Sequence, residues 1–72
     1  MTHNEIRVTK YLVELANQVH HETPNWQWAD WPTFQAVMAK RPRPIGHEFE
    51  LNDRAYMRCM RQAFVEVHRE GN

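Results

Sequence analysis

Two apolar stripes with the period of an α-helix, one near each end of the chain, most constrain how this sequence can fold. In the first stripe the spacings are four, three and four residues, at Val8, Leu12, Leu15 and Val19. The second stripe has the same period, at Tyr56, Met60, Ala63, Phe64 and Val67. Side chains at such spacings share one side of a helix. The sequence therefore predicts two long amphipathic helices, over residues 3–21 and 53–69.

Residues typical of helix ends stand beside both stripes. Thr2 and Glu5 have the spacing of a capping box, in which each side chain bonds to the backbone of the other residue. Asn4 is an alternative cap for the same helix. Pro24 ends the first helix because the residue before a proline is pushed out of the helical region. Asn52 is expected to cap the last helix.

The middle of the chain predicts a shorter helix. Asp30 has the character of an N-cap, and Pro32 suits the first turn, where its missing N–H costs nothing. We expect helix over residues 33–40. Pro42 and Pro44 then stop it, since alternate prolines favour an extended path.

The segments on either side of this short helix leave two interpretations open. Trp26 and Trp28 alternate with polar residues, and so do Phe49 and Leu51. Such segments are compatible with a minimal two-stranded pairing. We favour instead an irregular connection that tucks Phe49 and Leu51 under the helices.

Length and pattern together set the fold class. A chain of 72 residues buries barely enough surface for one core, so we expect residues 1–72 to form a single domain. The expected fold is all-α: two long helices packed together, a shorter helix across them and a Trp-rich irregular connection. No apolar stretch approaches the roughly 20 residues of a membrane span, and no signal-peptide pattern opens the chain. We expect no membrane partner.

Residues that could carry catalysis or bind metal are sparse. Cys59 is the single cysteine, which excludes an internal disulfide and favours a reducing, cytoplasmic setting. Nothing in the sequence identifies a base that would activate Cys59, so a buried structural thiol is expected. His20 and His21 are adjacent on a helix, and their rings diverge by about 100°. With no glycine-rich phosphate loop and no catalytic carboxylate pair, we expect a non-enzyme without metal or cofactor.

A basic stripe lies on the outer side of the last helix. Arg54, Arg58 and Arg61 are spaced i, i+4 and i+7, and Arg41 and Arg43 precede that helix by one loop. Guanidinium groups bind carboxylates and phosphates through paired hydrogen bonds. The stripe is therefore a solvated face, a site for an acidic protein, or a site for nucleic acid. The formal net charge of zero weighs against nucleic acid.

The tryptophan cluster, Trp26, Trp28 and Trp31, has a structural and a functional interpretation. Tryptophan builds cores because each buried ring removes a large area from water. It is also enriched where proteins bind one another. A core this small does not easily hold three such rings. We expect two of them to be mainly buried and Trp26 to be exposed.

A second apolar ridge on the first helix concerns self-association. Ile6 and Val13 lie seven residues apart, away from the main stripe. Isolated exposed apolar side chains need no explanation. A pair at this spacing is also typical of a contact between helices of two copies, and small domains often stabilise themselves in that way. A monomer and a homodimer both stay open.

These features predict a small non-enzymatic binding protein, an accessory or inhibitory factor of the kind that bacteria and their phages encode. The comparison with such factors is an analogy. We expect another protein as the partner, contacted through Trp26, Trp28, Arg41, Arg43, Arg54, Arg58 and Arg61. The alternative is a DNA-binding regulator that uses the arginine face of the last helix. The roughly eleven residues between the last two helices are too many for a helix-turn-helix.

Overall fold

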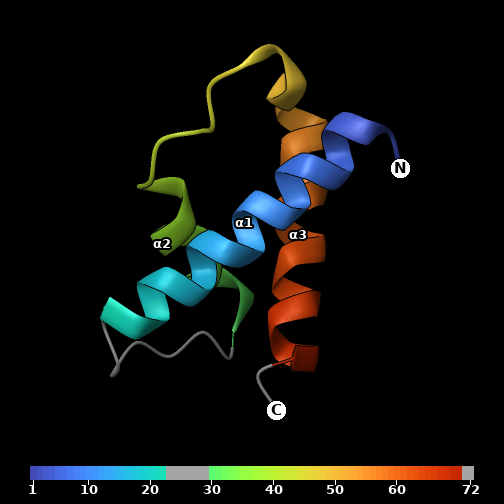
Figure 1. The fold of residues 1–72 in the computed structure, drawn as a ribbon. Coiled ribbons are helices and arrows are strands. Elements are labelled where there is room, and N and C mark those ends of the chain that lie inside the picture. Colours follow the sequence, from blue (N-terminus) through green and yellow to red (C-terminus); the bar gives the residue numbers. More distant parts are fainter. Residues whose placement is uncertain (23–29, 71–72) are drawn as a thin grey trace.

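The computed structural model describes residues 1–22 and 30–70, and the fold of these residues is all-α (Figure 1). Its helices are α1 (His3–Glu22), α2 (Trp31–Ala39) and α3 (Asp53–Glu70), and a 3₁₀ turn, η1 (His47–Phe49), precedes α3. The two long helices, α1 and α3, cross and pack together, and α2 packs against α3. The predicted class, two long helices and a shorter one, is confirmed. None of the described helices is long and apolar enough to span a bilayer.

The two long helices start at the caps that the sequence predicts. The Thr2 N–H donates to Glu5 Oε1 at 2.9 Å, and the Glu5 N–H donates to Thr2 Oγ1 at 3.2 Å, which is a complete capping box. At α3 the Ala55 N–H donates to Asn52 Oδ1 at 2.8 Å. These side chains satisfy backbone donors that have no partner inside the helix, so each start is determined locally.

The start of α2 differs from the prediction by two residues. Asp30 is the N-cap, as expected, and its Oδ1 accepts from the Thr33 N–H at 2.8 Å. The helix therefore begins at Trp31, with Pro32 in the first turn, rather than at residue 33. Because Trp31 belongs to the helix, its ring has a defined position over α3.

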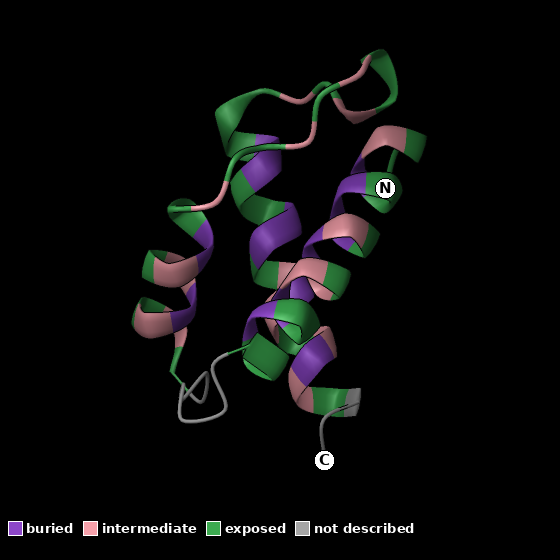
Figure 2. Cartoon of the chain, turned by 60° about the vertical axis from the view of Figure 1, so that its left-hand side comes forward, coloured by how far each residue is buried: buried purple, intermediate pink, exposed green. Residues whose placement is uncertain are grey.

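The core lies between the three helices, and Figure 2 shows the buried residues along their facing sides. α1 contributes the buried stripe that the sequence predicts, except that Leu15 is only partly buried. The largest part of the core is one connected cluster of buried residues: Val8, Leu12, Ala16, Phe34, Met38, Tyr56, Cys59, Met60, Ala63 and Val67. Burial of these faces, rather than helix propensity, stabilises helices of this length.

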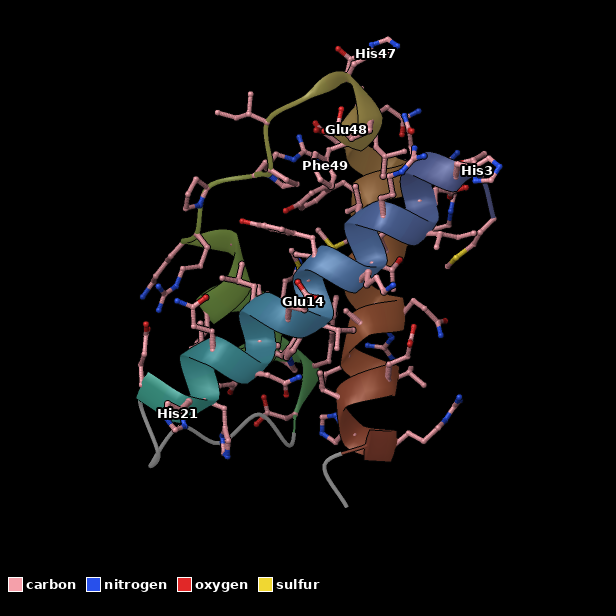
Figure 3. The ribbon with its side chains drawn as sticks, in the orientation of Figure 1. His3, Glu14, His21, His47, Glu48 and Phe49 are labelled. Atoms are coloured by element: carbon pink, nitrogen blue, oxygen red, sulfur yellow. The ribbon has the colours of Figure 1, made fainter. Side chains whose placement is uncertain are left out.

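The connection between α2 and α3 is irregular, as favoured, and the alternative of a strand there is wrong. Residues 47–49 form the η1 turn, and Phe49 and Leu51 pack against the core. The Phe49 ring lies 6.2 Å from that of Tyr11 on α1. Figure 3 shows Phe49 turned inward and His47 directed away from the helices. The predicted pairing partners, Trp26 and Trp28, lie outside the described residues.

Gly46 sets the entry into η1. Its φ of 136° is a conformation that side chains with a Cβ rarely adopt. A Cβ there would also approach the Glu48 carboxylate to 2.8 Å. The turn is anchored to α1 because the Asn4 side-chain amide donates to the Glu50 carbonyl at 3.1 Å.

Candidate functional site

A groove on α3 brings together three arginines that the sequence singles out for partner binding and two apolar residues that it does not. We call it the arginine groove. Its volume is about 500 Å³, and it is lined by two apolar side chains, Trp31 and Met57, and by Arg54, Arg58 and Arg61. We refer to the apolar pair as its floor and to the three arginines as its rim. Trp31 comes from the start of α2, and the other four residues come from α3.

The spacing along α3 explains how one helix supplies most of this groove. Arg54, Arg58 and Arg61 lie three or four residues apart, so their side chains share one side of the helix. Met57 lies between them and is 39% exposed, a large value for a long apolar side chain. Sequence reasoning did not include Met57 among the candidate binding residues. Its spacing of i+3 from Arg54 was the available signal.

Trp31 rests on a stack of aromatic rings. Its ring centroid lies 5.5 Å from that of Phe64 at an angle of 71°, and 6.1 Å from that of Phe34. Phe34 and Phe64 are 5.2 Å apart and meet edge to face. Such pairs add to the stabilisation that comes from burial. The floor of the groove is therefore a supported surface and not a loose side chain.

The three arginines of the rim have different partners. The Arg61 guanidinium lies 4.8 Å over the Trp31 ring and 5.6 Å from the Phe64 ring. Arg58 donates to Glu5 Oε2 on α1 at 3.1 Å. Within the part of the chain that the structure describes, neither Arg54 nor Arg61 forms an ion pair. The groove therefore carries uncompensated positive charge beside exposed apolar surface.

Glu5 is the acidic residue that compensates part of this charge. Its side chain is only 12% exposed. The hydrogen bond from the Thr2 backbone N–H, followed by that from Arg58, lowers the pKa of Glu5 from 4.5 to about 2, although burial opposes the shift. Sequence reasoning identified Glu5 as a cap only. Its second role, holding Arg58, depends on a contact between residues 53 positions apart.

Arg41 and Arg43, also predicted for partner binding, lie outside the arginine groove. Arg41 is 3.9 Å from a Glu22 carboxylate oxygen. Arg43 donates to Asp53 Oδ1 at 2.9 Å, and its guanidinium lies 3.8 Å over the Tyr56 ring. Both cations therefore have acidic neighbours, which weakens their attraction for a further anion. The basic residues do not form one continuous positive face.

The tryptophans divide between described and undescribed residues. Trp31 is half-buried in the floor of the arginine groove. Trp26 and Trp28 lie outside the described residues. Their predicted exposure and their predicted role in partner binding therefore stay predictions.

A second groove follows the outer side of α1 and contains both residues predicted for self-association. We call it the mixed-charge groove. It has a volume of about 530 Å³, and the residues that characterise it are Ile6, Thr9, Lys10, Val13, Glu14 and Glu66. Ile6 is 51% exposed and Val13 is half-buried. The two side chains thus face one hollow.

Cys59 lies in the core, and its thiol donates to the Glu5 carbonyl at 3.4 Å. This contact agrees with the expected structural thiol. Among the described residues, no three histidine, cysteine or acidic side chains lie together as a metal site would require. The side chains that line the two grooves are mostly apolar or charged, which suits contact with the surface of a partner.

Comparison with protein-family models, with curated proteins and with solved structures finds no match.

Proposed function

We propose that this chain is a small non-enzymatic binding protein that acts as an accessory or inhibitory factor through the arginine groove. One observation carries the proposal: half-buried Trp31 and exposed Met57 line the same groove as Arg54 and Arg61, which have no ion-pair partner among the described residues. Tryptophan and arginine are the residues most enriched where a few side chains carry most of the binding energy.

The partner that this groove fits is an acidic protein segment with an apolar anchor. An aliphatic or aromatic side chain on the floor would displace water from Trp31 and Met57. Carboxylates beside that anchor would accept paired hydrogen bonds from the guanidinium groups of the rim. Trp26 and Trp28 are further candidate contacts on the sequence alone. A cytoplasmic location is part of the proposal, because the single cysteine is a buried thiol.

Nucleic acid is the second candidate, since guanidinium groups bind phosphates equally well. The three arginines along α3 favour it. The acidic neighbours of Arg41, Arg43 and Arg58 favour a protein, because they interrupt the positive surface that a phosphate backbone needs. The net charge of zero has the same implication.

The first test is photo-cross-linking in cells of the source organism, with a photoreactive amino acid at Met57. The matched control is the same group at Ile45, which is apolar and 94% exposed but lies in the connection before η1. We expect Met57 alone to capture a discrete protein, cross-linked at a segment that contains acidic residues. Equal capture at both positions would indicate non-specific hydrophobic contact.

The second test measures the affinity of the captured protein for defined variants. Arg54→Ala/Arg61→Ala should lower affinity by about thirtyfold, since a loss near 2 kcal/mol is typical of such contacts. Arg41→Ala/Arg43→Ala, which removes the same charge elsewhere, should change it by less than about threefold. A random-sequence DNA duplex provides the other arm. DNA binding with a steep salt dependence that the first variant abolishes, without protein capture, would contradict the proposal.

A further inference from the structure

The mixed-charge groove differs from the arginine groove in carrying both signs of charge. Lys10 and Glu14 are exposed, lie one helical turn apart on α1 and flank the apolar pair Ile6 and Val13. Glu66 lies across the groove on α3. Figure 3 shows Glu14 about midway along the outward side of α1. The groove thus combines apolar surface with an adjacent cation and anion.

A surface that binds its own copy across a twofold axis must be complementary to itself, because the same patch is presented twice. Two arginine grooves would not meet this condition, since each would bring guanidinium groups against guanidinium groups. The mixed-charge groove does meet it. Lys10 of one copy and Glu14 of the other are opposite in charge, and the twofold axis makes each such pair twice.

The register of this contact follows from helix geometry. Consider two antiparallel α1 helices related by a twofold axis that crosses them midway between Lys10 and Glu14. Rotation about this axis places residue 10 of one helix level with residue 14 of the other. It also leaves a side chain on the same side of the interface in both copies. Lys10 therefore lies opposite the partner's Glu14. Val13 is one residue, about 1.5 Å, from the axis, so the two Val13 side chains meet there.

The groove also has a polar atom without a partner in its wall. Thr9 is 5% exposed, and no hydrogen bond to its hydroxyl exists within residues 1–22 and 30–69. Buried hydroxyls are usually satisfied, by protein or by water. Because the Thr9 oxygen is itself shielded from the surface, this hydroxyl concerns the stability of the folded monomer and not the contact described next.

We infer that the mixed-charge groove is the contact surface for a second copy of this chain, in an antiparallel α1–α1 homodimer centred on Val13 and held by reciprocal Lys10–Glu14 pairs. The dimer leaves the arginine groove free on α3. The inference is independent of the proposed function, since a monomer could still use the arginine groove.

Charge reversal and mixing test the dimer without altering the core. The unmodified protein should sediment as a dimer whose fraction rises with concentration. Lys10→Glu places acidic groups against acidic groups, and Glu14→Lys places basic against basic. Each variant alone should weaken dimerisation by at least about tenfold, because like charges across an interface are costly.

The two variants mixed in equal amounts should recover the dimer, since every contact in the mixed pair again joins a cation to an anion. The control for Lys10→Glu is Arg69→Glu, which makes the same charge change at the end of α3 and should leave dimerisation unaltered. Helix content by circular dichroism shows whether each variant folds. A monomeric unmodified protein at all concentrations, or folded variants that fail to recover on mixing, would overturn the inference.

Discussion

The arginine groove and the mixed-charge groove have similar volumes and differ in the sign of their charges. The first is lined by Trp31, Met57 and three guanidinium groups, which come from α2 and α3. The second is lined by aliphatic side chains and by charges of both signs, mainly from α1. Apolar area provides attraction in both cases, but it does not specify the occupant. The charges do, because a surface of one sign selects an opposite partner, whereas a surface of both signs can match itself.

The largest expected effects come from the side chains that hold each groove in place. Leu12 is fully buried and fastens α1, which carries the mixed-charge groove, onto α3. Phe64 supports Trp31 in the arginine groove. We expect Leu12→Ala and Phe64→Ala each to lower the free energy of unfolding by about 2–5 kcal/mol, with Phe64→Ala at the lower end because Phe64 is partly exposed.

Chemical denaturation of both variants measures this loss. Near-normal stability of either variant would contradict the packing that positions its groove. Under conditions where both variants stay folded, Phe64→Ala should weaken partner binding and Leu12→Ala should weaken dimerisation. This division would show that the two surfaces are supported separately.

The next effect concerns Glu5, which links α1 to Arg58 in the rim of the arginine groove. The pKa of Glu5 is about 2 in the folded protein and 4.5 at its unperturbed value. The ionised form is therefore favoured by folding, and its stabilisation is fully present above about pH 4.5. It is lost as the pH falls from there through about 2. Protonation also releases Arg58 from its anionic partner.

An acid titration by NMR checks the pKa of Glu5 directly, and thermal melts between pH 5 and about 2 check its effect on stability. Glu5→Gln should flatten the part of the acid transition that Glu5 causes. Glu48→Gln, which changes an exposed carboxyl in η1, should leave that transition as it is. A Glu5 pKa near 4.5 would mean that neither the hydrogen bonds from Thr2 nor the Arg58 contact holds in solution.

The smallest expected effect is a gain. Thr9→Val replaces a buried hydroxyl that lacks a hydrogen bond with a methyl group of similar size. We expect the free energy of unfolding to rise by about 1 kcal/mol, because the cost of the unsatisfied group disappears. The measurement is made in dilute solution, where the monomer dominates. Destabilisation there would mean that the Thr9 hydroxyl is satisfied within the monomer.

The helices of this protein could be predicted from sequence because their determinants are local. The Thr2–Glu5 box and the Asn52 cap act within one turn, and a stripe with helical period identifies the side that becomes buried. The short helix was predicted to begin at residue 33, but it begins at Trp31, two residues earlier. The Asp30 cap, which is itself a local feature, already places the first helical residue at Trp31, because the residue after an N-cap begins the helix.

The residues of the two grooves also fall into those that the sequence places together and those that only the packing of the helices brings together. The chain alone placed Arg54, Arg58 and Arg61 on one side of a helix, and Ile6 with Val13 on another, because helical periodicity decides which side chains are neighbours. Only the tertiary structure decided which of these side chains meet another element. The crossing of α1 and α3 gave Arg58 its partner Glu5, and the packing of α2 set Trp31 beside Met57. Such contacts join residues far apart in sequence, and their geometry follows from how whole helices pack rather than from any local pattern.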